Sequence, residues 1–112
     1  MDKYSYDKEI DALSLKKEEY AYAYSIEITD GIILDLNEKH NVIGLEILDA
    51  SEILEISEIY LKEANEVNAE IMVTKKGIKI SLIFNINNDK KVSNNLISGL
   101  YSNNLNSSFA TT

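Results

Sequence analysis

The chain of 112 residues contains no cysteine, arginine, proline or tryptophan. Without cysteine it can form no disulfide, no thiolate metal site and no thiol nucleophile. Without arginine, and with a formal net charge of −8, it lacks the basic face and the bidentate contacts that nucleic-acid recognition usually needs. We therefore expect no nucleic-acid partner, and the charge favours a basic protein instead. The alternative is that the acidity only keeps the protein soluble. The missing proline and tryptophan indicate a biased composition and carry no functional conclusion.

Long hydrophobic runs are also missing. No apolar stretch approaches the roughly 18 residues that span a bilayer, so we expect no membrane partner. The first residues, MDKYSYDKE, are charged from the second position onward, which is not the pattern of a signal peptide. With 45% hydrophobic and 27% charged residues, the composition is that of an ordinary globular protein. We expect one cytoplasmic domain spanning residues 1–112.

Residues 24–50 alternate between apolar and polar side chains, which predicts an antiparallel β-meander. A two-residue turn at Asp30 and Gly31 would mix apolar with acidic partners. A three-residue loop of residues 29–31 places Gly31 in the left-handed conformation of a bulged turn and keeps one face apolar. That register pairs Ile28 with Ile32, Ile26 with Leu34 and Tyr24 with Leu36, and leaves Glu27 and Asp35 on the other face beside Ser25 and Ile33.

The same apolar face continues into a second reversal over Asn37–Val42, with Lys39 and His40 at its tip. This reversal brings residues Leu36, Leu34 and Ile32 opposite residues Ile43, Leu45 and Ile47. Two earlier strands are expected on either side of the polar loop Asp7–Asp11, around the alternating segments 4–6 and 12–15. We expect Tyr20, Tyr22 and Tyr24 to extend the third strand on its apolar side, giving four or five short strands before residue 49.

The period then changes to that of a helix. Asp49 and Glu52 have the spacing of a capping box, and apolar residues recur at helical spacing after them. We expect a helix from about Ser51 to Ala64 that packs on one side of the sheet. Its apolar positions are Ile53, Ile56, Ile59 and Tyr60, and its glutamates, Glu52, Glu55, Glu58 and Glu63, face water.

Residues 67–86 predict a further hairpin. A two-residue turn at Lys76 and Gly77 makes every matched pair apolar: Val73 with Ile80, Ile71 with Leu82, Ala69 with Phe84 and Val67 with Ile86. The hairpin either extends the sheet of the meander or covers an edge of a second subunit, because an isolated ribbon is marginally stable. The Asn- and Ser-rich segment 92–112 has i, i+4 apolar spacings that allow one poor helix.

The fold class is therefore α+β: an antiparallel meander over residues 4–54, the helix end and the hairpin over residues 55–91, and the C-terminal segment 92–112.

Three groups of residues are candidates for chemistry. Asp7, Glu9 and Asp11 alternate in one loop and could hold calcium or magnesium, but bonds to backbone amides of that turn are the simpler role. Asp35, Asn37, Lys39, Asn41 and Glu46 have EF-hand spacing, yet Lys39 and His40 break the ligand pattern and strands flank the loop. We expect no metal, cofactor or catalytic residue from these patterns.

The single histidine, His40, and the seven tyrosines are the remaining polar features. His40 would act as a general base only beside a nucleophile in a concave site, so we interpret it as a solvated turn residue with positive φ. The tyrosine stripe is typical of a core or a dimer surface, which favours self-association. Its members are Tyr4, Tyr6, Tyr20, Tyr22 and Tyr24.

Three motifs carry a resemblance to a known family: YDKEIDAL from Tyr6, Asp30 and Gly31 followed by Asp35, and GLEILDAS from Gly44 to Ser51. With these motifs, residues 4–54 resemble the domain of unknown function family 2283. This chain departs from the family pattern at the second hairpin tip, where Lys39 and His40 replace the common Asp-Gly. The family has no established reaction, and the resemblance implies at most an antitoxin-like partner of a small basic toxin.

Two functional hypotheses follow. The first is a small acidic, non-enzymatic protein-interaction module that forms a dimer. The alternative is a small ligand- or metal-binding domain or enzyme, with a carboxylate site of Asp7, Glu9, Asp11 or Asp35 at a subunit interface.

Overall fold

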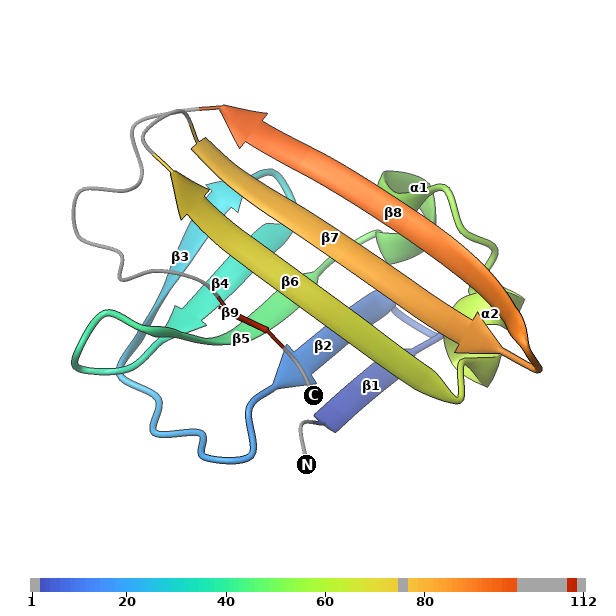
Figure 1. The fold of residues 1–112 in the computed structure, drawn as a ribbon, viewed down its shortest axis with the longest axis horizontal. Helices are drawn as coiled ribbons and strands as arrows, with labels where there is room; N and C mark the ends of the chain where they lie inside the picture. Colours follow the sequence, from blue (N-terminus) through green and yellow to red (C-terminus); the bar gives the residue numbers. More distant parts are fainter. Residues whose placement is uncertain (1–2, 75–76, 99–108, 111–112) are drawn as a thin grey trace.

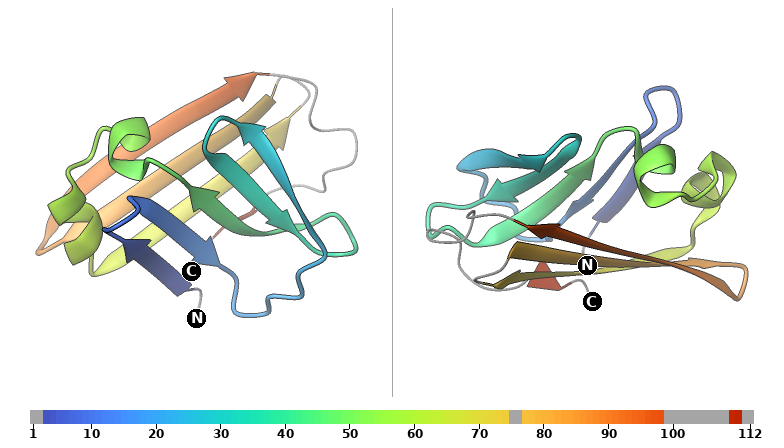
Figure 2. Two further views of the ribbon diagram at one scale, coloured as in Figure 1. Left: turned by 180° about the vertical axis from the view of Figure 1, so that it is seen from behind. Right: turned by 90° about the horizontal axis from the view of Figure 1, so that it is seen from above.

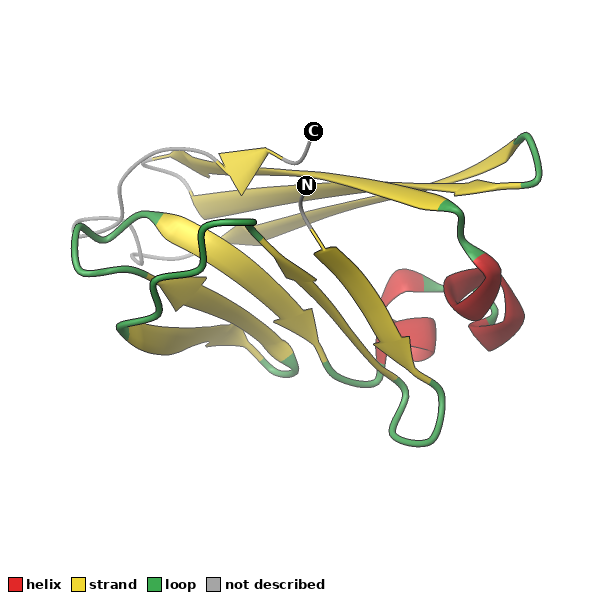
Figure 3. Ribbon diagram, turned by 90° about the horizontal axis from the view of Figure 1, so that it is seen from below, coloured by secondary structure: helices red, strands yellow, loops and turns green. Residues whose placement is uncertain are grey.

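The computed structural model describes residues 3–74, 77–98 and 109–110. Its strands form two antiparallel sheets that lie face to face, with two short helices at one end of the layers (Figure 1; Figure 3). The first sheet has the order β1 (Lys3–Asp7), β2 (Ala12–Lys16), β5 (Val42–Ile47), β4 (Ile32–Leu36) and β3 (Tyr24–Thr29). The second has the order β8 (Asp89–Ser98), β7 (Gly77–Ile86), β6 (Glu66–Thr74) and β9 (Phe109–Ala110). The predicted α+β class is confirmed.

The first hairpin confirms the predicted face but not the loop. Tyr24 pairs with Leu36 and Ile26 with Leu34, as predicted, and Gly31 has a φ of 80°. The register shifts between Glu27 and Thr29, so Thr29 and not Ile28 pairs with Ile32. The predicted three-residue loop is therefore wrong. The bulge lies at Ile28, within β3 and not in the turn, so the apolar side chains stay on one face although the turn is shorter than predicted.

A second irregularity lies in the β4–β5 pair. Ile32 pairs with Ile47 and Leu34 with Leu45, as predicted. The register then shifts after Asp35, so Leu36 pairs with Val42 and not with Ile43. His40 has the predicted positive φ, 65°.

The tyrosine segment before β3 does not extend that strand. β3 begins at Tyr24, and residues 20–23 cross the end of the sheet without strand structure. The phenol of Tyr20 reaches Asp35, which lies on the outer face of the sheet, opposite the apolar side that we predicted. The stripe is thus divided: Tyr6 is buried, Tyr22 is exposed, and Tyr4, Tyr20 and Tyr24 are partly buried.

The predicted helix over residues 51–64 is two helices, α1 (Ala50–Leu54) and α2 (Glu58–Glu63), separated at Glu55, which has a φ of 55°. In one continuous helix, Leu61 would share a face with Leu54, but Ile56 would lie about 200° around from it. The break allows all three side chains to be buried, and it leaves Ile59 and Tyr60 exposed.

The predicted capping box is also wrong. Asp49 adopts a left-handed φ of 50°, and its side chain caps no backbone donor of α1. The cap of α1 comes from another part of the chain and is described with the site below.

The C-terminal hairpin has its own sheet. It does not extend the sheet of the meander, because β6 and β7 combine with β8 and β9 into a second layer over the first (Figure 2). That the hairpin covers an edge of a second subunit stays a prediction. Its register differs from the prediction by two residues: Val73 pairs with Ile78, Ile71 with Ile80, Ala69 with Leu82 and Val67 with Phe84. An even shift leaves each side chain on its predicted face, so apolar partners still meet.

Residues 89–98 form strand β8, so the predicted helix is wrong for residues 92–98. The rest of that predicted helix lies outside the described residues. β8 pairs with β7 over ten residues and gives the ribbon the third strand that its stability requires.

The inner faces of the two sheets share one hydrophobic core with the helices. Leu34 and Leu45 of the first sheet and Ile71 and Ile80 of the second are completely buried. Tyr4 links three elements: its ring meets the ring of Phe84 edge-on at 6.1 Å, and its hydroxyl donates to the carbonyl of Leu61 at 2.7 Å. In the described part of the chain, no helix has the length and apolar character to cross a membrane.

Candidate functional site

Asp11 connects the β1–β2 loop to the start of α1. Its carboxylate accepts the Tyr6 hydroxyl at 2.6 Å, the Ser51 hydroxyl at 2.7 Å and the Ser51 backbone N–H at 3.1 Å. Its backbone carbonyl accepts the N–H of Ala50 at 2.9 Å. The first turn of a helix leaves such N–H groups without partners, so Asp11 acts as a helix cap supplied from a distant loop.

The electrostatics of this contact favour the ionised carboxylate. Burial raises the pKa of Asp11, but the hydrogen bonds from Tyr6 and Ser51 outweigh it and leave the pKa below its ordinary value. Burial, followed by the hydrogen bond and the charge of Asp11, raises the pKa of Tyr6. At neutral pH this arrangement holds a charged carboxylate and a neutral phenol, and neither is poised to exchange a proton.

The other two members of the acidic loop lie apart from this contact. Asp7 accepts the backbone N–H of Glu9 at 2.9 Å, which is the turn-forming role weighed for it in the sequence, and both side chains are exposed. Asp11 bonds across to α1 and not to that turn. Among the described residues, no three acidic or histidine side chains gather in a way that could hold a metal ion.

Asp35 is the one buried charged residue in the described part of the chain, with 2% of its surface exposed. It lies on the outer face of β4, where it accepts the Tyr20 hydroxyl at 2.8 Å and the Ser25 hydroxyl at 2.7 Å. Gly44 is its partner across the β4–β5 pair, and a Cβ at Gly44 would stand 2.9 Å from Asp35 Oδ2. The carboxylate therefore fits only because residue 44 has no side chain.

Tyr20 connects this buried carboxylate to a cationic and a second aromatic side chain. Lys16 lies 5.0 Å from the centre of the Tyr20 ring, and Tyr22 stacks on Tyr20 at 6.0 Å. Burial, then the bond and charge of Asp35, raise the pKa of Tyr20. Both carboxylate oxygens already have donors, so the cluster is closed by groups of its own chain and serves the fold.

The residues with EF-hand spacing do not form a calcium-binding loop. Asp35 is buried as described, and Asn37 uses its side-chain oxygen to accept the backbone N–H groups of Lys39 and Asn41, each at 3.0 Å. His40 lies beside them, with Nδ1 2.5 Å from the Tyr24 hydroxyl in an exposed contact. These residues form the tip of a hairpin.

A hollow of about 380 Å³ lies where the β3–β4 turn meets the β5–α1 connection. Four carboxylates surround it, those of Glu27, Asp30, Asp49 and Glu52. Leu48 lines the hollow and is 41% exposed, and its backbone N–H donates to the carbonyl of Gly31 at 2.7 Å. The hollow thus combines negative charge with an apolar wall.

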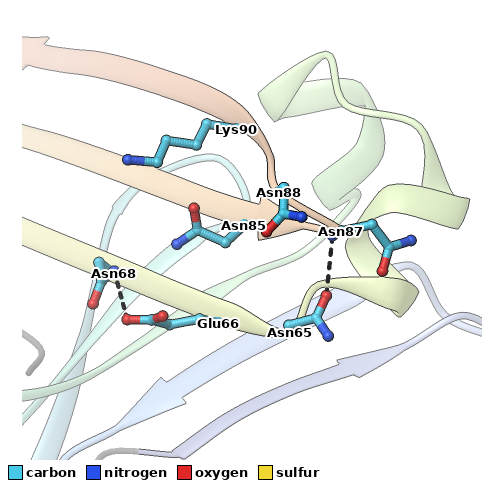
Figure 4. A pocket seen from close by; sticks show the side chains of 7 residues that line it. All are labelled: Asn65, Glu66, Asn68, Asn85, Asn87, Asn88 and Lys90. Atoms are coloured by element: carbon cyan, nitrogen blue, oxygen red, sulfur yellow. Dashed lines mark hydrogen bonds between the residues drawn. The ribbon is translucent and has the colours of Figure 1, made fainter.

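A larger polar groove of about 780 Å³ lies at the other layer, near the β7–β8 turn (Figure 4). It is lined by the amides Asn65, Asn68, Asn85, Asn87 and Asn88 together with Glu66 and Lys90. Asn65 accepts the backbone N–H of Asn87 at 3.3 Å, and Asn68 donates to Glu66 at 3.3 Å (Figure 4). The groove is open and polar, and its bonds hold the end of the second sheet.

Charge is divided unequally between the two layers. Residues 3–64, which include the first sheet and both helices, contain fifteen carboxylates and six lysines, a net charge of −9. The described residues that include the second sheet, 65–74, 77–98 and 109–110, contain three carboxylates and three lysines, a net charge of 0. The acidity of the protein therefore belongs to one layer.

Comparison with known proteins identifies the family. A family model described as "Protein of unknown function (DUF2283)" matches residues 3–51. A protein of Methanosarcina mazei named "Putative hypoxanthine phosphoribosyltransferase" is 32% identical over 90 residues, which cover 80% of this chain and 72% of that protein. No solved structure matches the chain. The chain belongs to the DUF2283 family, and the resemblance found in its motifs is confirmed.

The motif residues of the family largely bond one another in this fold. Asp11 bonds Ser51, Asp35 faces Gly44, and Gly31 accepts the N–H of Leu48. The predicted register already placed Asp35 opposite Gly44, and a lone glycine facing a carboxylate was a readable signal. No local pattern indicates that Tyr20 bonds Asp35 or that Ser51 bonds Asp11, because both contacts depend on how the chain folds back on itself.

Proposed function

We propose that the protein is a non-enzymatic interaction module that binds a basic protein through the acidic layer formed by residues 3–64. The observation that carries the proposal is the segregation of charge, −9 in this layer against 0 in the described residues of the other. A field of one sign on one face attracts a cationic partner and orients it during encounter. An antitoxin-like role, in which the layer masks a small basic toxin, is the specific form of this function.

The hollow beside Leu48 is the part of the layer best suited to such contact. Its four carboxylates surround an apolar wall. Lysine and arginine have apolar stems and charged ends, so one such side chain matches both parts of the hollow. The carboxylates of Asp11 and Asp35 stay out of this contact, because donors from the same chain already occupy them.

A synthetic peptide of alternating lysine and leucine is a suitable probe, with binding measured by calorimetry at low and high salt. We expect binding that weakens with salt. The double variant Asp30→Asn, Glu52→Gln should weaken it about tenfold, since each exposed charge contributes about 0.5–1 kcal/mol. The matched control is Glu66→Gln, Glu70→Gln in the second sheet, which removes the same charge and should leave affinity nearly unchanged. Equal weakening by both variants, or no binding by the native protein, contradicts the proposal.

The second candidate function is a ligand- or metal-binding domain or an enzyme with an interfacial carboxylate site. It is favoured by the name of the Methanosarcina mazei relative, "Putative hypoxanthine phosphoribosyltransferase". A phosphoribosyl donor is anionic. This chain has no arginine to bind its phosphate groups, and its carboxylates would repel them. We therefore place this function second. Formation of a nucleotide from hypoxanthine and a phosphoribosyl donor would support it, as would a higher melting temperature in millimolar calcium.

A further inference from the structure

Strand β8 forms one edge of the second sheet and pairs with β7 over ten consecutive residues (Figure 1). Asn87 and Asn88 both have positive φ, 47° and 74°, which is the geometry of a two-residue hairpin turn. The backbone groups of an antiparallel strand alternate between its two sides, and such a turn is closed by a hydrogen-bonded pair, here Ile86 and Asp89. Residues 90, 92, 94, 96 and 98 therefore direct their N–H and C=O groups away from β7.

The edges of the first sheet have features that discourage pairing with another chain. β1 has only five residues and carries Lys3, and β3 contains the bulge between Glu27 and Thr29. Short length, charge and bulges are the usual protections of an edge. β8 has none of them along most of its length: its register is regular over ten pairs, and residues 92–98 include no charged residue and no proline.

We propose that β8 pairs antiparallel with β8 of a second copy of this chain, about a two-fold axis perpendicular to the sheet. The two four-stranded sheets then become one continuous sheet. The alternation of backbone groups requires the outward-facing residues of the two copies to stand opposite each other. Asn94 opposite Asn94 of the second copy is the register that pairs all five of them. In that register Lys90 stands opposite Ser98, so no lysine faces another lysine.

The distribution of charge favours a second copy of this chain over a basic protein as the partner of the β8 edge. Two copies repel each other through a net charge of −8 each, but the excess of negative charge belongs to the layer of residues 3–64. β8 lies in the layer whose described residues have no net charge, so edge-to-edge contact joins the parts that repel least. A basic partner suits the acidic layer and not an edge that begins with Lys90 and Lys91. The contact is self-complementary and closes as a dimer.

The test is the mass in solution by sedimentation equilibrium of the full chain and of matched variants. The native protein should sediment as a dimer. Asn94→Lys puts two like charges directly opposite each other and should give a monomer. Ser81→Lys is the control, because Ser81 is the partner of Asn94 on β7 and carries the same charge one strand away from the edge. It should remain a dimer. An equimolar mixture of Asn94→Lys and Asn94→Glu should restore the dimer.

Disulfide formation across the proposed β8–β8 contact is a second test, which holds even if a charged variant fails to fold. Directly opposite residues in an antiparallel hydrogen-bonded pair have Cα atoms about 5.5 Å apart, within the range of a disulfide. The chain has no cysteine, so Asn94→Cys can form a disulfide only between copies. Mild oxidation should yield a covalent dimer, whereas Ser81→Cys should not. A monomeric native protein, an unchanged dimer of Asn94→Lys, or open-ended assemblies would overturn the proposal. These outcomes leave the peptide-binding test unaffected.

Discussion

The carboxylate of Asp11 accepts hydrogen bonds from both the backbone N–H and the hydroxyl of Ser51, forty residues further along the chain. Through this contact the β1–β2 loop fixes the start of α1, and the family motifs at the two ends of residues 3–51 meet.

Asp11→Asn should lower the free energy of unfolding by about 1–2 kcal/mol, the usual cost of losing a charged helix cap. Asparagine tolerates the φ of 50° at this position, so the loss reports the hydrogen bonds and not backbone strain. The measurement is denaturant unfolding. Asp49→Asn is the matched control, since Asp49 has the same φ but caps nothing, and its effect should stay within about 0.5 kcal/mol.

The same contact predicts a dependence on acid. The folded-state pKa of Asp11 is lower than its ordinary value, so its contribution is complete above an ordinary pKa of about 3.9 and is lost as pH falls through the folded value. Native protein should therefore lose more stability on acidification than Asp11→Asn. Parallel stability curves of the two proteins below neutral pH would contradict this expectation.

Three tyrosines should resist ionisation at alkaline pH. Burial raises the pKa of Tyr4, and burial together with a bonded carboxylate raises the pKa values of Tyr6 and Tyr20. Their stabilising effect is complete below the ordinary phenol pKa of about 10 and is lost as pH rises beyond it. The phenolate absorbance of these three groups should appear together with unfolding measured by circular dichroism. Tyr20→Phe should remove one late-titrating group. Their ionisation near pH 10 in a fully folded protein would refute the prediction.

Gly44→Ala should destabilise the protein by about 1–3 kcal/mol, because the new methyl group meets the carboxylate of Asp35 at 2.9 Å. Asp35→Ala makes room for that methyl group, so the double variant should be more stable than the sum of the two single losses predicts. We expect a coupling above about 0.5 kcal/mol in the double-mutant cycle. Additive losses would show that the two positions do not interact.

Neighbouring positions on β7 test the two-layer packing. Leu82 is completely buried on the inner face, whereas Ile83 is 37% exposed on the outer face. Leu82→Ala should cost about 2–5 kcal/mol through the cavity it leaves, and Ile83→Ala clearly less. Thermal unfolding of both variants measures the difference. Equal losses would mean that the second sheet does not pack on the first through its inner face.

Much of the fold could be predicted because strand alternation reports which face is buried. The pairs Tyr24–Leu36, Ile26–Leu34 and Leu34–Leu45 follow from that period alone. The turns could not be fixed as well. A bulge in β3 and a two-residue slip of the β6–β7 hairpin both preserve the apolar face, so the pattern does not distinguish these registers.

The helical region and the candidate sites were harder to predict because they depend on distant contacts. The 3.6-residue period suggested one helix, but burial of Ile56 with Leu54 and Leu61 required a break at Glu55. The i, i+4 spacings after residue 92 suggested another helix, yet residues 89–98 pair with the edge of β7 as a strand. Asp11 and Asp35 were recognised as polar candidates, but their partners Ser51 and Tyr20 lie in segments that only folding brings near.

The sequence by itself determined the α+β class, the faces of the strands, the positive φ values at Gly31 and His40, and the acidic character of the protein, since these depend on local spacing and composition. Tertiary structure decided that the C-terminal hairpin becomes a second layer, that Asp11 caps α1, and that the excess of negative charge lies in one layer. The physical reason is that buried surface and unpaired backbone groups are satisfied by whichever segments fit together in space, and no local pattern records that choice.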